Sequence, residues 1–184
     1  RGDRRVVLAA VQRDPLALKF AAHELRDDHE VVLAACKLVG HALQYASDAL
    51  RGDRGVVLAA ITNSWRALAF ASAGLRQDRD FMLAAVCVHG SALLFASPEI
   101  KDDHEVVLTA VKRSGWALSC ASDRLRHDRE CVEAAVISNP AALDFATESL
   151  QADPMLTYLA SWASGRRGTS SPCSVGGAPQ CALM

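Results

Sequence analysis

Apolar and polar positions follow a pattern that returns every 25 residues along the chain. An aspartate marks each return, and we number the positions of the unit from it. Apolar residues fill positions four to nine, Gly or Pro comes near position thirteen, and a second apolar group lies at positions fifteen to nineteen. Self-similarity at a fixed period is typical of repeat proteins. The aspartates are Asp3, Asp28, Asp53, Asp78, Asp103, Asp128 and Asp153.

Within one unit, this pattern predicts two helices and a short third turn. Aspartate suits a helix N-cap because its carboxylate accepts from the free N–H groups of the first turn. Proline is favoured at the first position of a helix, and Pro154 directly follows Asp153. The apolar run 31–36 predicts a first helix buried between neighbours, and residues 42–46 predict the second. The serine that follows, Ser47 in this unit, predicts a third turn of 3₁₀ type.

A unit this short cannot bury its own apolar faces, so the sequence predicts an all-α solenoid of stacked units. Six full copies span residues 3–152, and a partial seventh copy follows. We expect this last copy to form a capping helix, because polar residues such as Thr157 and Ser161 replace apolar ones. The predicted division is a solenoid over residues 1–163 and a disordered Gly/Ser/Pro tail over residues 164–184.

Composition agrees with a folded helical protein. Apolar residues make up 51% of the chain, charged residues 22% and aromatic residues only 5%. Alanine, the strongest helix former, is frequent and lets helices approach closely. The net charge of −1 argues against a surface for bulk polyanions. No apolar run reaches the roughly 18 residues that a membrane-spanning helix needs.

Two stretches carry a resemblance to a known family. Residues 25–35 read L-R-D-D-H-E-V-V-L-A-A, and residues 100–110 repeat this order closely. The pattern resembles the repeats of the family called domain of unknown function 4116, from Arg1 to about Leu150. The resemblance implies an α-helical repeat fold. It implies no activity, because that family has no assigned catalytic or binding residues to carry over.

Charged residues form three columns along the repeat. For the aspartates, helix capping is the simple interpretation, and a functional ladder of carboxylates is the alternative. We expect the basic residues at position twenty-four to pair with the aspartate two residues on, or with acids such as Glu30. Binding along a phosphate backbone is their alternative role, and with it the chain would be a nucleic-acid-binding solenoid. The basic columns are Arg26, Arg51, Arg76, Lys101 and Arg126, and Arg4, His29, Arg54, Arg79, His104 and Arg129.

No motif in the sequence supports catalysis. The chain has no P-loop, no dinucleotide-binding glycine pattern, no G-x-S-x-G and no Cys/His cluster with zinc spacing. We therefore predict a non-enzyme with no catalytic residues, cofactor or metal. The alternative is that the chain is the repeat region of a larger enzyme whose catalytic domain precedes Arg1.

Three cysteines and one glutamate depart from the repeat at apolar positions. Cys36, Cys120 and Cys131 replace Val or Phe of sister units. They indicate reduced core thiols and hence a cytoplasmic protein. Glu133 stands where the other full units have leucine. We expect a partly wet site there, with contact to a polar partner as the alternative.

The most variable positions of the unit, ten to fourteen, cluster at the turn between the first two helices. Solenoids commonly bind partners along one such edge. We predict a scaffold for an unidentified protein partner, with Trp65, Arg66 and Trp116 as anchors, because Trp and Arg dominate binding hot spots. Neutral variation of an exposed turn is the alternative.

The last four residues, Cys-Ala-Leu-Met, match the C-a-a-X prenylation box, and a terminal Met favours farnesyl. We predict farnesylation of Cys181, which would hold the solenoid at the cytoplasmic face of a membrane. One lipid binds a membrane only weakly, so a second signal is expected. Cys173, as a palmitoylation site, and the basic pair Arg166-Arg167 are the candidates. A coincidental match is the alternative.

Overall fold

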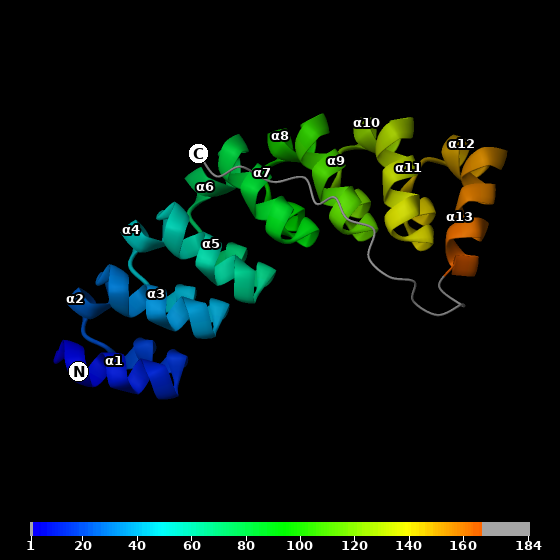
Figure 1. Cartoon of the computed structure of the whole chain (residues 1–184). Coiled ribbons are helices and arrows are strands. Elements are labelled where there is room, and N and C mark those ends of the chain that lie inside the picture. Colours follow the sequence, from blue (N-terminus) through cyan, green and yellow to red (C-terminus); the bar gives the residue numbers. More distant parts are fainter. Residues whose placement is uncertain (1, 167–184) are drawn as a thin grey trace.

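The computed structural model describes residues 2–166, and every element in this range is helical. The helices stack in chain order into a curved array, with the first unit at one end of the arc and α13 at the other (Figure 1). The predicted all-α solenoid is confirmed. The long first helices of the units are α1 (Arg4–Arg13), α3 (His29–Leu38), α5 (Arg54–Asn63), α7 (Arg79–Val88), α9 (His104–Arg113), α11 (Arg129–Ser138) and α13 (Pro154–Arg166).

The second element of each full unit is a 3₁₀ helix of six residues. In the second unit, the N–H of Ala42 donates to the carbonyl of Val39 at 2.9 Å, three residues earlier. The sequence predicted 3₁₀ geometry for the third element instead, and that was wrong. The second segment is too short for several α-helical turns, so the tighter helix closes it. These elements are η1 (Pro15–Phe20), η2 (Gly40–Tyr45), η3 (Trp65–Phe70), η4 (Gly90–Phe95), η5 (Gly115–Cys120) and η6 (Pro140–Phe145).

The third element is a single α-helical turn that also links neighbouring units. Ser47 caps one of these turns, since its hydroxyl accepts from the N–H of Leu50 at 3.2 Å. The N–H of Ser47 itself donates to the carbonyl of Arg26 in the preceding unit at 2.9 Å. These helices line the convex rim of the arc (Figure 1). They are α2 (His23–Arg26), α4 (Asp48–Arg51), α6 (Ala73–Gln77), α8 (Pro98–Lys101), α10 (Asp123–Arg126) and α12 (Glu148–Gln151).

The repeating aspartate caps the long helices, as the sequence predicted. In α3, the Oδ1 atom of Asp28 accepts from the backbone N–H groups of Glu30 and Val31, each at 3.0 Å. Every long helix from α1 to α13 begins with the same kind of bond from its aspartate. The cap satisfies donors that the helix itself cannot pair. It therefore fixes where each unit starts.

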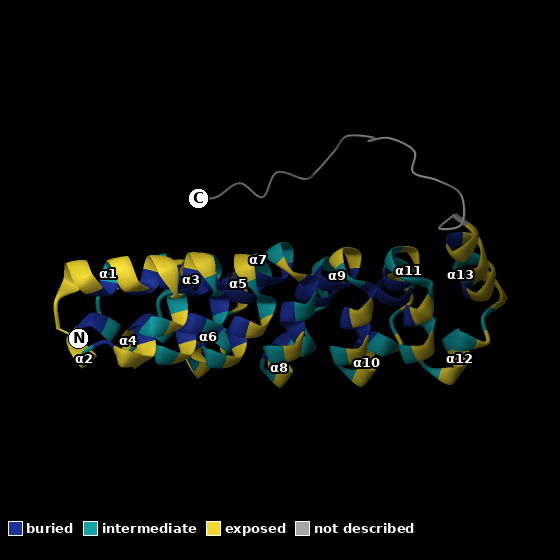
Figure 2. Cartoon of the chain, turned by 90° about the horizontal axis from the view of Figure 1, so that it is seen from below, coloured by how far each residue is buried: buried dark blue, intermediate teal, exposed yellow. Residues whose placement is uncertain are grey.

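The core is a continuous apolar layer between the long helices and the 3₁₀ helices (Figure 2). In α3, Val31, Val32, Ala35 and Cys36 are fully buried, and the same positions are buried in the units that follow. No polar or charged residue is buried in the part of the chain that the structure describes. Each unit therefore depends on its neighbours to keep its apolar surface from water.

Glycine at position thirteen sets how closely units pack. A Cβ atom added to Gly115 would lie 2.5 Å from the carbonyl oxygen of Ala135 and 2.8 Å from Cβ of Asn139, both in the next unit. Gly40 and Gly90 face the corresponding carbonyls even more closely. Only a residue without a Cβ permits this approach. The sequence predicted these glycines as turn residues, and the structure adds a role in spacing.

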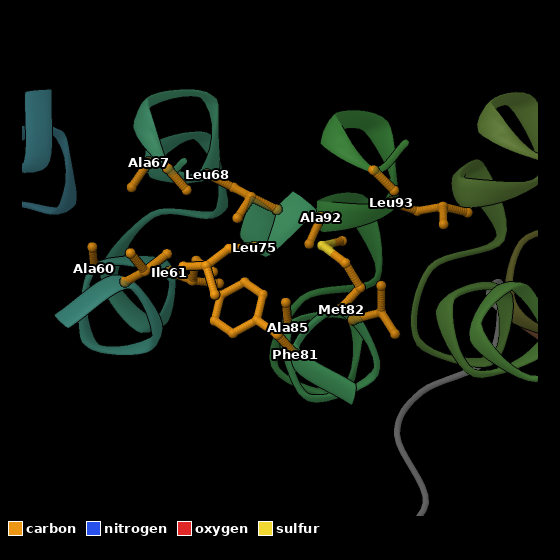
Figure 3. Packing of buried hydrophobic residues seen from close by; sticks show 14 of the residues in the cluster. Ala60, Ile61, Ala67, Leu68, Leu75, Phe81, Met82, Ala85, Ala92 and Leu93 are labelled. Atoms are coloured by element: carbon orange, nitrogen blue, oxygen red, sulfur yellow. The ribbon is translucent and has the colours of Figure 1, made fainter. Parts of the chain in front are cut away.

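The interface between α5 and α7 is built differently. Trp65 replaces glycine at its position thirteen, and α5 and α7 contact one another less extensively than the other neighbouring long helices. The larger side chains of Phe81 and Met82 occupy positions that hold smaller residues in the other units. Figure 3 shows Phe81 beside Ile61 and Leu75 in this interface. Without glycine, α5 and α7 lack the close approach found at the glycine positions, and the larger side chains of α7 fill the interface between them.

The last described helix, α13, packs on the sixth unit through Leu156, which is buried. Thr157 and Ser161 are exposed on it, as expected for a capping helix. The helix continues to Arg166, past the boundary that the sequence suggested after residue 163. Within residues 2–166, no helix combines the length and apolar character needed to cross a bilayer.

A concave edge as candidate interaction surface

The variable positions ten to fourteen of the six full units lie along the inner side of the arc (Figure 1). There, the long helices end and the 3₁₀ helices begin. We call this surface the concave edge. It comprises residues 12–16, 37–41, 62–66, 87–91, 112–116 and 137–141.

Large apolar side chains are exposed on the concave edge. Trp116 is 55% exposed and Ile137 is 62% exposed, and Leu16 and Leu38 are also exposed. A monomeric protein gains nothing from leaving such groups in water, and lines of exposed apolar residues often mark binding sites. The edge therefore has the apolar component of an interaction surface.

The same edge is basic. Exposed Lys and Arg side chains outnumber its only acidic residue, Asp14, by five to one. Cations near helix C-termini also complement the helix dipole, so part of this bias is explained by helix stability alone. The surplus nevertheless gives the edge a positive field that favours an acidic partner. The basic residues are Arg13, Lys37, Arg66, Lys112 and Arg113.

Two of the predicted anchors, Trp65 and Arg66, lie next to each other at the start of η3. The Arg66 guanidinium lies 4.5 Å from the centroid of the Trp65 ring, a cation–π arrangement. Trp65 in turn contacts Phe95 of the next unit, with ring centroids 5.7 Å apart. Trp65 is half-buried and Arg66 is exposed. The pair is thus held in place before any partner arrives.

Trp116, the third predicted anchor, lies at the start of η5. Its ring contacts that of Phe145 in the following unit, with centroids 5.3 Å apart and the ring planes inclined at 59°. His41 makes the equivalent contact with Phe70 at 6.0 Å. Aromatic residues at position eighteen therefore pack against edge side chains of the preceding unit. Sequence reasoning missed this row, although Phe or Tyr recurs at position eighteen in five of the six units.

Side chains at position eleven tie the edge to the preceding unit. Asn63 donates to the carbonyl of Leu38 at 2.9 Å and accepts from the N–H of Gly40 at 3.2 Å. Ser138 accepts from the N–H of Gly115 at 3.1 Å in the same way. Such bonds satisfy backbone groups that the helix end leaves open. They hold the turns of neighbouring units in fixed relative positions.

The second basic column, at position two, is paired rather than free. Arg4 Nε donates to Asp28 at 2.7 Å, and Arg79 Nε donates to Asp103 at 2.8 Å. Each cation thus bonds the capping aspartate of the next unit. The bond from Arg4 lowers the pKa of the Asp28 carboxyl below its usual range. A column already neutralised in this way offers little to a phosphate backbone.

The first basic column does not pair as the sequence predicted. Arg51 bonds Asp48 and Arg126 bonds Asp123, three residues earlier in their own short helices. The expected partner aspartates are instead taken by the position-two residues. One helical turn brings positions twenty-one and twenty-four onto one face, and that local geometry decides the pairing. The Nε atoms of Arg26, Arg76 and Arg126 are buried without a hydrogen-bond partner.

Glu133 is only half-buried, and it accepts from Arg129 Nε at 2.7 Å. The expectation of a partly wet site is confirmed. The leucines at this position in sister units are likewise only partly buried. The carboxylate therefore avoids the cost of isolated burial.

None of the cysteines within the described residues forms a disulfide. Cys36 and Cys131 are buried in the core, as the sequence predicted, whereas Cys120 is only partly buried and packs against the core. Burial raises the pKa of the Cys36 and Cys131 thiols to about 12, because the thiolate would lose its hydration. The two cysteines of the predicted lipidation sites, Cys173 and Cys181, lie outside the described residues.

A family model described as Domain of unknown function (DUF4116) matches the chain three times in tandem, over residues 3–51, 53–101 and 103–151. Each match runs from one capping aspartate to the end of the second short helix after it. No curated protein and no solved structure matches the chain significantly.

Proposed function

The chain belongs to the family described as Domain of unknown function (DUF4116), and we propose that it is a non-catalytic scaffold that binds a protein along its concave edge. The observation that carries this proposal is the exposed apolar and basic side chains on one side of the arc. A rigid array that presents such an edge fits partner binding better than chemistry, which needs an enclosed constellation of reactive groups.

We further propose that the elementary unit of the scaffold has 25 residues and that each family-model match is a pair of such units. The spacing of the long helices supports this, since α1, α3 and α5 begin at Arg4, His29 and Arg54. Each unit then contributes one segment of the concave edge. A bound partner would meet a similar set of contacts once per unit, as in other solenoids.

The chemistry of the edge favours an acidic protein segment with apolar side chains. Trp116 and Ile137 offer apolar contact area, while Lys112 and Arg113 beside them offer positive charge. Trp65 and Arg66 are already ordered by their stacking, so little conformational entropy remains to be lost on binding. These features make Trp65, Arg66 and Trp116 candidates for anchors of the interface.

Alanine at Trp65, Arg66 and Trp116 together is expected to abolish recovery of the partner in a pull-down, a loss of at least tenfold. The physical reason is the removal of central, pre-ordered anchors. Circular dichroism checks that helicity is retained. Tyr158→Ala provides a matched control, because Tyr158 is an exposed aromatic on α13 away from the edge. Equal recovery of the partner by the triple variant and the wild type would show that these three residues do not anchor it.

The wild type and the triple variant also distinguish a protein-binding scaffold from a nucleic-acid-binding solenoid. Single-stranded RNA binding at low salt that weakens steeply as salt rises would favour a polyanion surface over a protein partner. We expect no such binding, because Arg4 and Arg79 are engaged by aspartates of neighbouring units. Salt-sensitive RNA binding that is lost in the triple variant would replace the scaffold proposal.

We also propose that the chain is farnesylated at Cys181 and held at the cytoplasmic face of a membrane. Support comes from the sequence Cys-Ala-Leu-Met at 181–184. Fourteen residues lie between Arg166, where α13 ends, and Cys181. An extended chain of that length spans up to about 50 Å, enough to reach a transferase. Cys173 and the basic pair at 166–167 supply the second membrane signal.

Intact-mass analysis of the protein from its own cells is expected to show a farnesyl group that Cys181→Ser removes. Fractionation is expected to move the variant from the membrane fraction to the cytosol, because a single palmitoyl group and two positive charges bind only weakly. Cys173→Ser keeps the farnesyl mass and serves as the control. A wild-type protein without the added mass contradicts this part of the proposal.

A further inference from the structure

Three side chains that favour metal ions converge where the fifth unit meets the sixth. His104 is the first residue of α9, Asp128 caps α11, and Cys131 lies in the first turn of α11. One ligand atom from each lies within 4.8 Å of the others. The Nε2 atom of His104 is 3.5 Å from Oδ1 of Asp128. Nitrogen, oxygen and sulfur ligands from two consecutive units thus meet at one point.

The same combination is absent from the other interfaces between the described units. Four of them have arginine in place of His104, and arginine cannot ligate a metal. At the remaining one, His29 lies 4.0 Å from Asp53, but Val56 occupies the position of Cys131. The chain therefore contains a natural comparison site that has the histidine and aspartate but not the thiol.

We propose that His104, Asp128 and Cys131 bind a Zn²⁺ ion. Imidazole, carboxylate and thiolate are the ligands that zinc prefers, with bonds of about 2.0–2.3 Å. In a tetrahedral site such bonds place the ligand atoms about 3.3–3.8 Å apart, so small rotations of the side chains suffice. Oδ1 of Asp128, which lies 3.5 Å from His104 Nε2, also caps α11 by accepting from the N–H of Cys131 at 2.9 Å, so the backbone of α11 orients this carboxylate toward the histidine.

Solvent can reach this site from one side. The His104 side chain is 41% exposed and that of Asp128 is 36% exposed, while Cys131 forms the buried floor. This open side leaves room for a water molecule as the fourth ligand of the ion. Glu130 lies at the rim, with Oε2 3.7 Å from His104 Nε2, and adds negative charge that attracts a cation.

Binding displaces a proton from the thiol. The Cys131 thiol loses its proton to solvent as sulfur bonds to zinc, and His104 binds the ion through a ring-nitrogen lone pair. No oxidation takes place, because zinc is not redox active. The bound ion joins α9 to α11 and so adds a cross-link between two units that otherwise meet through apolar contacts and a few hydrogen bonds. The metal would stabilise the end of the array against separation of these units.

The competing interpretation is that His104 merely replaces arginine in the column of ion pairs. Two substitutions that restore sister residues separate the interpretations without a loss of packing. Cys131→Val introduces the valine found at this position in four other units, and His104→Arg introduces the common cation. Both variants are expected to fold. His29→Arg is the matched control, because it changes the comparison site that lacks the thiol.

Titration of the full chain with ZnCl₂ by calorimetry is expected to show one site that His29→Arg leaves unchanged. Cys131→Val and His104→Arg are each expected to weaken it at least tenfold. With Co²⁺ as a probe, the wild type should show a thiolate-to-metal charge-transfer band that Cys131→Val removes. Tail cysteines are present in every protein compared, so they cannot produce these differences. Absence of binding by the wild type, or unchanged binding by either variant, overturns the proposal.

Discussion

Replacing Phe81 with alanine is expected to lower the free energy of unfolding by about 3–5 kcal/mol. Phe81 is 1% exposed and fills the interface between α5 and α7 beside Ile61 and Leu75 (Figure 3). This interface lacks the glycine that permits close approach at Gly40, Gly90 and Gly115. The two helices therefore cannot move together to fill the cavity that alanine leaves. Urea denaturation of the wild type and the variant, followed by circular dichroism, measures the difference.

Val6→Ala is the matched control for this substitution. Val6 occupies the same position of the first unit, but its side chain is 60% exposed. We expect a change of no more than about 0.5 kcal/mol, as is usual for exposed sites. A loss below about 1 kcal/mol for Phe81→Ala would mean that the α5–α7 interface can collapse, and the account of its packing would be wrong.

Gly115→Ala is expected to destabilise the protein by about 1–3 kcal/mol, the usual cost of overpacking. The added Cβ would lie 2.5 Å from the carbonyl oxygen of Ala135 and 3.0 Å from the backbone nitrogen of Asn139. Backbone atoms cannot rotate away as side chains do, so the sixth unit must shift. Thermal denaturation measures the effect on the midpoint.

Gly74→Ala gives this experiment a control of opposite sign. Gly74 lies exposed in α6, and nothing lies within 4 Å of the position where its Cβ would be. Alanine there reduces the entropy of the unfolded chain and is expected to stabilise by about 0.5–1 kcal/mol. If both substitutions stabilise, close approach at position thirteen does not limit the spacing of the units.

Sequence reasoning reached the solenoid and the start of each long helix because capping and apolar periodicity are local signals. Asp28 caps α3 as predicted, and Val31 and Val32 are buried as predicted. The type of the second element was predicted wrongly. Residues 42–46 place the same side chains inward in an α-helix or a 3₁₀ helix, so periodicity over so short a segment could not separate them.

Contacts between units were harder to predict than the units themselves. Arg4 bonds Asp28, 24 residues on, and a linear pattern offers several aspartates at similar distances in sequence. His104, Asp128 and Cys131 show no metal-binding spacing for the same reason, since they come from two units. An alignment of the units places position two of one unit beside positions one and four of the next. That register between neighbouring units is the signal in the sequence that points to the site.

The geometry of the three predicted anchors follows from packing only in part. Trp65, Arg66 and Trp116 lie on the concave edge. The two tryptophans contact aromatic rings of the following units, and Arg66 lies over the Trp65 ring, so packing explains part of why they are there. Packing alone does not require Trp116 to be more than half exposed. Binding would account for that exposure, and only a partner can test it.

Hydrogen–deuterium exchange of the chain with and without its partner tests the scaffold proposal most directly. On partner binding, we expect slower exchange in peptides that cover residues 62–66 and 112–116, on the concave edge. Peptides that cover the short helices of the convex rim, such as 48–51 and 123–126, should exchange at unchanged rates. Protection confined to the convex rim, with unchanged exchange along the concave edge, would contradict the account.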